Sequence, residues 1–322
     1  MAFANNGIKH HTPMKTNEII NSDVIDALKG LPDNSIDCCV TSPPYFGLRD
    51  YGVEGQIGLE KTPEEYIAKL TEVFRHVRRI LKPEGTLWLN IGDSYNGYKG
   101  NSKREYCGSD YAGFRNQPTR PANFGLECKG LKEKDLIGIP WLLAFALRSE
   151  GWYLRQDIIW HKPSVMPESV KDRCTKSHEY IFLLSKSKRY YFDCRSIAEP
   201  ASTFDNIVRD RKTTKLNNTP GRTPMKGLLR NNYTTKNKRS VWTISAKPFK
   251  GAHFAVFPEQ LVEPCIKAGC PEDGIVLDPF MGSGTTAVVA RKLGRNFIGT
   301  ELNPRFVELA KERLKKELGL FI

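Results

Sequence analysis

Hydrophobic positions along this chain follow two alternating patterns, continuous apolar runs and helical repeats. Residues 36–40, IDCCV, are apolar except for Asp37 and form a run of strand length between turn-forming residues. From 66 to 81, apolar residues recur at three- and four-residue spacing, which predicts a helix with one face on a core. Thr62, Pro63 and Glu65 mark its start, because threonine caps a helix, proline fits the first turn and glutamate completes a capping box.

The same alternation continues to the end of the chain. Further strands are predicted over residues 86–91, 154–160, 179–184, 190–193, 275–277 and 296–300, and further helices over 24–28, 141–147, 259–267, 285–293 and from 303 onward. Residues 185–189 would join two of these strands as a hairpin. Alternating strands and helices predict an open, mostly parallel α/β sheet, whose ligands bind beyond the carboxyl ends of the strands.

Three segments depart from this pattern. Residues 1–16 resemble a flexible arm, and residues 97–135, rich in Gly, Asn, Arg and Tyr, predict a mobile loop. Residues 195–250 are polar, basic and irregular, which indicates an inserted region. The predicted α/β domain therefore consists of two parts, residues 17–194 and residues 251–322.

The positive charge of the chain is concentrated in two of these segments. The 322 residues include 49 Lys and Arg against 36 Asp and Glu, a net charge of +13. Residues 195–250 hold 13 basic and 3 acidic residues, and residues 97–135 hold 8 and 5, so the remainder is neutral with 28 of each. Such a local excess is the footprint of a nucleic-acid binder, with a solvated basic face as the alternative.

Composition excludes several classes of protein. The longest apolar stretch, residues 139–147, is far shorter than the roughly 20 residues of a membrane-spanning helix, so no membrane association is expected. The first 15 residues have no apolar core, so their pattern does not predict a secretory signal peptide. Eight cysteines without CxxC spacing indicate neither a disulfide scaffold nor a zinc site, so we expect no metal and a cytoplasmic protein.

A glycine loop at 278–286, DPFMGSGTT, follows the predicted strand 275–277. Gly282 and Gly284 would let the backbone approach a ligand at the start of the next helix. Glu301 ends the following strand, where a carboxylate can accept both hydroxyls of a ribose. A P-loop is disfavoured because no lysine follows Gly284, whereas GSGTTA leaves NAD open beside S-adenosylmethionine.

A second motif, Ser42-Pro43-Pro44-Tyr45, follows the strand 36–40. Two prolines fix consecutive φ angles and so aim their carbonyl groups rigidly. The Ser42 hydroxyl adds a hydrogen-bond acceptor, and Tyr45 adds a flat aromatic face. This set of groups suits a planar amine, whose N–H groups need acceptors and whose ring can stack on tyrosine.

Together, residues 42–45 and 278–286 resemble the amino-group DNA methyltransferases of bacteria and phages, over nearly the whole chain. The catalytic motif precedes the cofactor loop, which is the order of the β class, a circular permutation of the usual methyltransferase order. The resemblance implies a Rossmann-like fold, S-adenosyl-L-methionine as cofactor, double-stranded DNA as partner and a target-recognition region at about 195–250.

The resemblance also assigns residues to roles. It implies catalytic roles for Ser42, Pro43, Pro44 and Tyr45, and cofactor contacts for Asp23, His253, Phe254, Asp278, Phe280, Gly282, Gly284, Thr285 and Glu301. Asp93 is expected to line the base pocket, and the tryptophans are expected to pack in the core.

Serine in the first position of the motif is typical of cytosine-N4 enzymes in this family, and aspartate of adenine-N6 enzymes. We therefore expect transfer to the N4 amine of a flipped cytosine, with adenine N6 as the alternative. A nicotinamide-dependent oxidoreductase and a non-catalytic DNA-binding module remain more distant alternatives. The sequence does not give the recognition site, and it does not say whether a cognate restriction endonuclease exists. It also leaves open whether the protein is a monomer or a homodimer.

Overall fold

A computed structural model describes residues 14–96, 130–201, 234–245 and 258–319 of the chain. The chain forms two compact units, Met1–Phe192 together with Ser240–Ile322, and Asp193–Arg239. Most of the predicted arm 1–16, most of the loop 97–135, and His253 and Phe254 lie outside the described residues.

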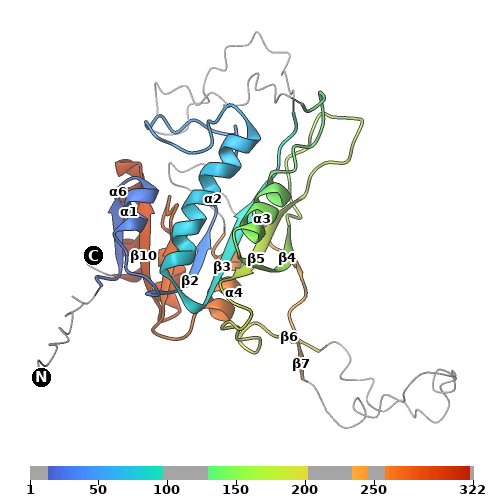
Figure 1. Cartoon of the computed structure of the whole chain (residues 1–322). Helices are drawn as coiled ribbons and strands as arrows, with labels where there is room; N and C mark the ends of the chain where they lie inside the picture. Colours follow the sequence, from blue (N-terminus) through green and yellow to red (C-terminus); the bar gives the residue numbers. More distant parts are fainter. Residues whose placement is uncertain (1–13, 97–129, 202–233, 246–257, 320–322) are drawn as a thin grey trace, which may run out of the picture. The chain divides into compact units, whose positions relative to one another are not determined.

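The larger unit contains an eight-stranded sheet in the order β1-β10-β9-β2-β3-β5-β4-β8 (Figure 1). Its strands are β1 Glu18–Asn21, β2 Ile36–Thr41, β3 Leu81–Ile91, β4 Tyr153–His161, β5 His178–Ser185, β8 Val241–Thr243, β9 Ile275–Asp278 and β10 Asn296–Glu301. Only β5 runs antiparallel to its neighbours, so the described sheet is mostly parallel, as predicted. The carboxyl ends of the other seven strands meet at one edge.

Helices cover both faces of this sheet. They are α1 Val24–Lys29, α2 Pro63–Ile80, α3 Ile139–Ser149, α4 Glu259–Gly269, α5 Thr285–Lys292 and α6 Pro304–Leu318. Helices α1, α2 and α3 lie side by side on one face (Figure 1). The alternation of side chains along β2 separates the faces, since Cys39 joins the core under α2 while Cys38 lies next to Gly269 of α4.

Helix α2 shows how local sequence sets these elements. Thr62 Oγ1 accepts a hydrogen bond from Glu65 N at 3.2 Å, and the Glu65 carboxylate reaches back to Lys61 N at 3.1 Å. The predicted apolar stripe is buried, with Tyr66, Leu70 and Phe74 among its fully covered side chains. The helix start and the core face are therefore confirmed.

Several predicted boundaries were wrong. Residues 190–193 form no strand and no hairpin with β5; Tyr191 N donates a hydrogen bond to Glu84 O, and Phe192 stacks on Trp88 at 6.2 Å between ring centroids. Strand β3 begins at Leu81, directly after α2, instead of at residue 86. Strand β1, which the prediction lacked, pairs in parallel with β10.

The smaller unit, Asp193–Arg239, contains a two-stranded antiparallel ribbon of β6 Glu199–Pro200 and β7 Thr235–Lys236. Arg239 Nε pairs with Glu199 Oε2 at 2.9 Å across this ribbon. The unit is shorter than the predicted region 195–250, because β8 pairs with β4 in the sheet of the larger unit. None of the helices in the described part of the chain has both the length and the apolar character that crossing a membrane requires.

Candidate active site

One cavity of about 520 Å³ opens at the carboxyl edge of the sheet, within the range of small-molecule sites. Nine residues assigned from the sequence line it, namely Asp23, Ser42, Pro43, Pro44, Tyr45, Phe280, Gly282, Thr285 and Glu301. The two motifs, more than 230 residues apart, meet here because β2 pairs directly with β9. The cavity therefore joins the glycine loop and the Ser-Pro-Pro-Tyr corner in one space.

The glycine loop turns the chain from β9 into α5. Gly282 and Gly284 have φ angles of 51° and 78°, in the left-handed region that glycine adopts without strain. A Cβ at Gly284 would lie 2.9 Å from Ala310 Cβ of α6. Gly284 itself is not among the residues that line the cavity. Backbone conformation and packing against α6 therefore explain why position 284 is a glycine.

Glu301, at the end of β10, is held in place by backbone amides. Its Oε2 accepts from Gly282 N at 2.8 Å, and its Oε1 accepts from Asn303 N at 2.9 Å. Burial raises the pKa of this carboxyl, and the backbone hydrogen bonds oppose the rise. Each oxygen keeps a lone pair for a further donor such as a ribose hydroxyl.

Asp23 and two aromatic rings complete this end of the cavity. Asp23 caps α1, and its Oδ1 accepts from Ile25 N at 2.8 Å. Tyr51 and Phe306 meet edge to face at 6.0 Å between ring centroids, and both line the cavity. Sequence reasoning missed these two rings, because neither belongs to a motif.

The Ser-Pro-Pro-Tyr corner follows the buried strand β2. Tyr66 Oη donates to Pro44 O at 2.7 Å, which fixes the second proline carbonyl. The Pro43 carbonyl accepts no hydrogen bond within the described part of the chain, and Pro43 lines the cavity. The Tyr45 ring packs so closely on Gly92 that a Cβ there would lie 2.7 Å from Tyr45 Cε2.

A polar network that the sequence did not predict holds the Tyr45 hydroxyl. Tyr45 Oη donates to Glu179 Oε2 at 2.7 Å, and Lys162 Nζ forms a short ion pair with the other oxygen of Glu179. Asn90 Nδ2 also donates to Glu179 Oε2, at 3.3 Å. Lys162 Nζ lies 4.2 Å from the centroid of the Trp160 ring, and all five side chains line the cavity.

This network affects the ionisation of Tyr45. Burial raises the pKa of the phenol well above 10, and the neighbouring Glu179 carboxylate raises it further. The phenol therefore stays protonated and donates to Glu179 at neutral pH. Tyr45 offers the cavity an uncharged aromatic face in a fixed orientation.

Two acidic residues have other roles than contact with the cavity. Asp278 is fully buried and accepts hydrogen bonds from Thr41, Thr286 and the Phe280 amide, and it is not among the lining residues. The prediction that Asp93 lines the base pocket was wrong. Its Oδ1 instead accepts from Gly138 N and Ile139 N at 3.0 Å each, at the start of α3.

The residues at the glycine-loop end fit S-adenosyl-L-methionine. Glu301 would accept hydrogen bonds from ribose hydroxyls, and Phe280, Tyr51 and Phe306 would give an adenine an apolar surface. The loop contains no lysine that would bind a triphosphate. The fold and site thus define an S-adenosyl-L-methionine-dependent DNA methyltransferase. The chain belongs to the DNA methylase family N6_N4_Mtase, whose sequence profile matches residues 36–312.

Individual relatives agree with this assignment. The chain is 50% identical over 301 residues to the type II methyltransferase M.SmaI of Serratia marcescens, covering 94% of this chain and 91% of that protein. It is 44% identical over 303 residues to the type II methyltransferase M.XycI of Xanthomonas campestris pv. cyanopsidis, covering 94% and 89%. The family resemblance and the cofactor expected from the sequence are confirmed.

Solved structures share the fold at lower identity. TTHA0409 of Thermus thermophilus, solved with S-adenosyl-L-methionine, matches with a TM-score of 0.58 at 24% identity, covering 94% of this chain and 95% of that one. The PvuII DNA methyltransferase, described as cytosine-N4-specific, matches with a TM-score of 0.58 at 20% identity, covering 91% and 86%. The predicted Rossmann-like methyltransferase fold is thereby confirmed.

Proposed function

We propose that this enzyme transfers a methyl group from S-adenosyl-L-methionine to the exocyclic N4 amine of a cytosine flipped out of duplex DNA. The observation that carries the proposal is the single cavity shared by Glu301 at one end and Ser42 and Tyr45 at the other. Serine in the first position of the catalytic motif supports cytosine N4 over adenine N6, by resemblance to cytosine-N4 enzymes.

The catalytic corner would hold the target amine by its two N–H groups. One N–H would donate to Ser42 Oγ and the other to Pro43 O, which accepts nothing else within the described residues. Two such acceptors localise the nitrogen lone pair, which is otherwise delocalised into the ring. Because Tyr66 fixes the neighbouring Pro44 carbonyl, the corner is rigid before the base arrives.

Tyr45 would stack on the flipped base. Flipping costs roughly a few kcal/mol, and stacking on an aromatic side chain returns about 1–3 kcal/mol. The contacts of Tyr45 with Gly92 and Glu179 keep its ring in place, so the stacking surface is already oriented. The bound cofactor supplies an electrophilic sulfonium methyl group. Ser42 is a weak base, so the released proton would pass to water.

We further propose that Asp193–Arg239 recognises the target sequence. This segment holds 11 Lys and Arg against 4 Asp and Glu, a net charge of +7. Such a segment would contact phosphates for position and base edges for sequence, and its binding would weaken steeply with salt. The type II methyltransferases among the relatives support a role in a restriction-modification system.

The test is transfer of labelled methyl to mixed-sequence duplex DNA, followed by mass spectrometry of the nucleosides. N4-methylcytosine is the expected product, and N6-methyladenine would overturn the proposed base. Ser42→Ala should abolish transfer while cofactor affinity, measured by calorimetry, stays unchanged. Full activity of this variant would refute the role of Ser42. Ser149→Ala, the same change at an exposed residue that does not line the cavity, serves as the control.

A further inference from the structure

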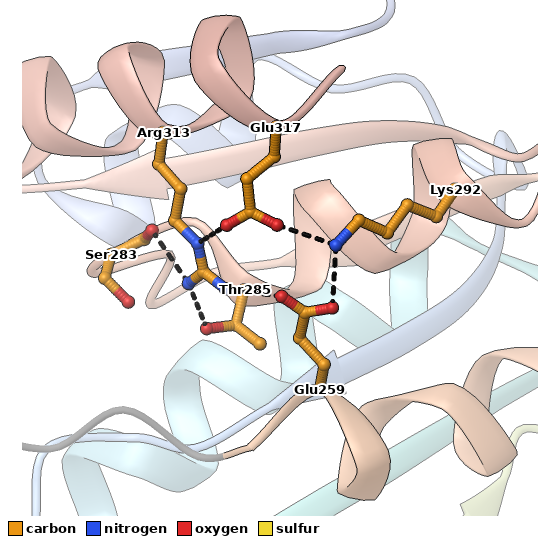
Figure 2. A network of polar contacts seen from close by, with 6 residues as sticks. All are labelled: Glu259, Ser283, Thr285, Lys292, Arg313 and Glu317. Carbon is orange, nitrogen blue, oxygen red and sulfur yellow. Dashed lines mark hydrogen bonds and ion pairs between the residues drawn. The ribbon is translucent and has the colours of Figure 1, made fainter. Parts of the chain in front are cut away.

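Arg313 of α6 lies at the centre of a charged network behind the glycine loop (Figure 2). Its side chain is only 10% exposed, although it carries a full charge. It donates to Glu259 Oε1 at 2.8 Å and to Glu317 Oε1 at 2.6 Å. Both carboxylates also bind Lys292 of α5, at 2.9 Å and 2.6 Å, so two cations share the same two acids.

Arg313 differs from Lys292 in one respect, which is its contact with the glycine loop. Arg313 Nη1 donates to Thr285 Oγ1 at 2.9 Å and makes a long contact of 3.5 Å with Ser283 O (Figure 2). Ser283 and Thr285 both line the cavity. Within the described part of the chain, the Lys292 ammonium bonds to the two acids and not to this loop.

The loop needs such support because of its own composition. Gly282 and Gly284 reach many backbone conformations in the absence of other contacts, and ordering them on binding would weaken affinity for a ligand. Helix α6 provides the support at two points, through Ala310 against Gly284 and through Arg313 against Thr285. The planar guanidinium suits this position, since it can bind two carboxylates and a hydroxyl at once.

We propose that Arg313 is a positioning residue for cofactor binding, which holds the glycine loop in its binding conformation through Thr285. The inference rests on the proposed placement of S-adenosyl-L-methionine at this loop. It predicts that the Arg313 contact affects cofactor affinity specifically, beyond any effect on folding.

The experiment compares Arg313→Met with Lys292→Met. Each variant leaves Glu259 and Glu317 with one cation, so Lys292→Met shows what the loss of a cation from the network does to cofactor binding. Only Arg313→Met removes the bond to Thr285. We expect the Kd for S-adenosyl-L-methionine, measured by calorimetry, to rise at least about tenfold in Arg313→Met and less than about twofold in Lys292→Met. The maximal rate at saturating cofactor and the KM for DNA should change little in both.

Thr285 provides a second test that does not depend on the folding of Arg313→Met. Thr285→Val removes the acceptor and keeps the shape, whereas Thr285→Ser keeps the hydroxyl. The inference is supported if the Kd for S-adenosyl-L-methionine rises in Thr285→Val and equals the wild-type value in Thr285→Ser. Equal Kd values in wild type, Thr285→Val and Arg313→Met overturn it, as does an equal loss of affinity in Lys292→Met.

Glu301→Ala separates this inference from the placement of the cofactor. If Glu301→Ala weakens cofactor binding and Arg313→Met does not, the positioning role fails and the cofactor placement stands. If neither variant weakens binding, the placement of the cofactor at this loop fails as well.

Discussion

Thr41 and Asp278 are joined by a hydrogen bond of 2.6 Å, from Thr41 Oγ1 to Asp278 Oδ1, across 237 residues of sequence. Thr41 directly precedes the Ser-Pro-Pro-Tyr motif, and Asp278 begins the glycine loop. The second oxygen of Asp278 accepts from Thr286 Oγ1, also at 2.6 Å. One buried carboxyl group therefore sets the distance between the two halves of the site.

The buried Asp278 carboxyl should make stability depend on pH. Burial raises its pKa from 3.8 to about 6, against the hydrogen bonds from Thr286, Thr41 and Phe280 N. The folded chain thus holds this proton more tightly than the unfolded chain, so the stabilisation is full below about pH 3.8 and is lost as pH rises through 6.

Asp278→Asn removes this ionisation. Relative to the variant, the wild-type free energy of unfolding should fall by about 3 kcal/mol at most as pH rises from about 4 to 7. Urea denaturation at a series of pH values measures the difference in free energy of unfolding between the two proteins. Because both carry the same other carboxyl groups, the contributions of those groups cancel in this difference. A difference that does not change with pH would contradict the raised pKa.

Glu179 should act on catalysis through the Tyr45 hydroxyl. Tyr45→Phe removes the donor of the 2.7 Å hydrogen bond and Glu179→Gln replaces its charged acceptor by a neutral one, so each should lower the single-turnover rate by roughly 10- to 100-fold. The double variant should lose little more than the stronger single variant, because both changes act on this hydrogen bond. Multiplicative losses would mean that Glu179 acts independently. Glu150→Gln, which removes an exposed pair with Arg75, is the control.

Gly92 should be required for the orientation of Tyr45. Gly92→Ala would place a Cβ 2.7 Å from Tyr45 Cε2, so the ring must shift away from its stacking position. We expect the transfer rate to fall by about tenfold or more, with cofactor affinity unchanged. Gly30→Ala is a suitable control, because its Cβ would lie 3.4 Å from the nearest atom and its φ is −72°. Equal rates in the two variants would contradict the prediction.

Tyr66 should stabilise the catalytic corner by its hydroxyl group. Tyr66→Phe leaves the Pro44 carbonyl without its donor in a partly buried site, which should lower the free energy of unfolding by about 1–3 kcal/mol. Thermal or urea unfolding measures this loss. Tyr190→Phe removes a hydroxyl bonded to Arg155 near the surface and should change stability much less. A similar effect of both changes would argue against a role for the Pro44 contact.

Residues within one stretch of sequence were the most predictable. The cap of α2 at Thr62, the glycine loop and Glu301 each follow from neighbouring residues, and the structure places them as expected. Asp278 was predictable as part of the loop, but its three buried hydrogen bonds were not, because Thr41 comes from the other half of the chain.

Residues assembled from several strands could not be predicted. Asn90, Lys162 and Glu179 lie at the ends of three strands and belong to no motif. Only the antiparallel register of β5, which pairs Ile91 with Tyr180 and His161 with His178, brings them together. Asp93 was misassigned for the same reason, since the backbone amides that it accepts from lie 45 and 46 residues away.

The place of β2 between β9 and β3 has a consequence for synthesis of the chain. All six residues of β2 are buried, yet its partner β9 begins at Ile275, 234 residues after Thr41. At typical ribosomal speeds this interval lasts on the order of 10–50 s. During that time β2 has no partner on its β9 side, and an unpaired strand edge is a template for aggregation. The strand pairing that joins the two halves of the site can therefore form only after most of the polypeptide has been synthesised.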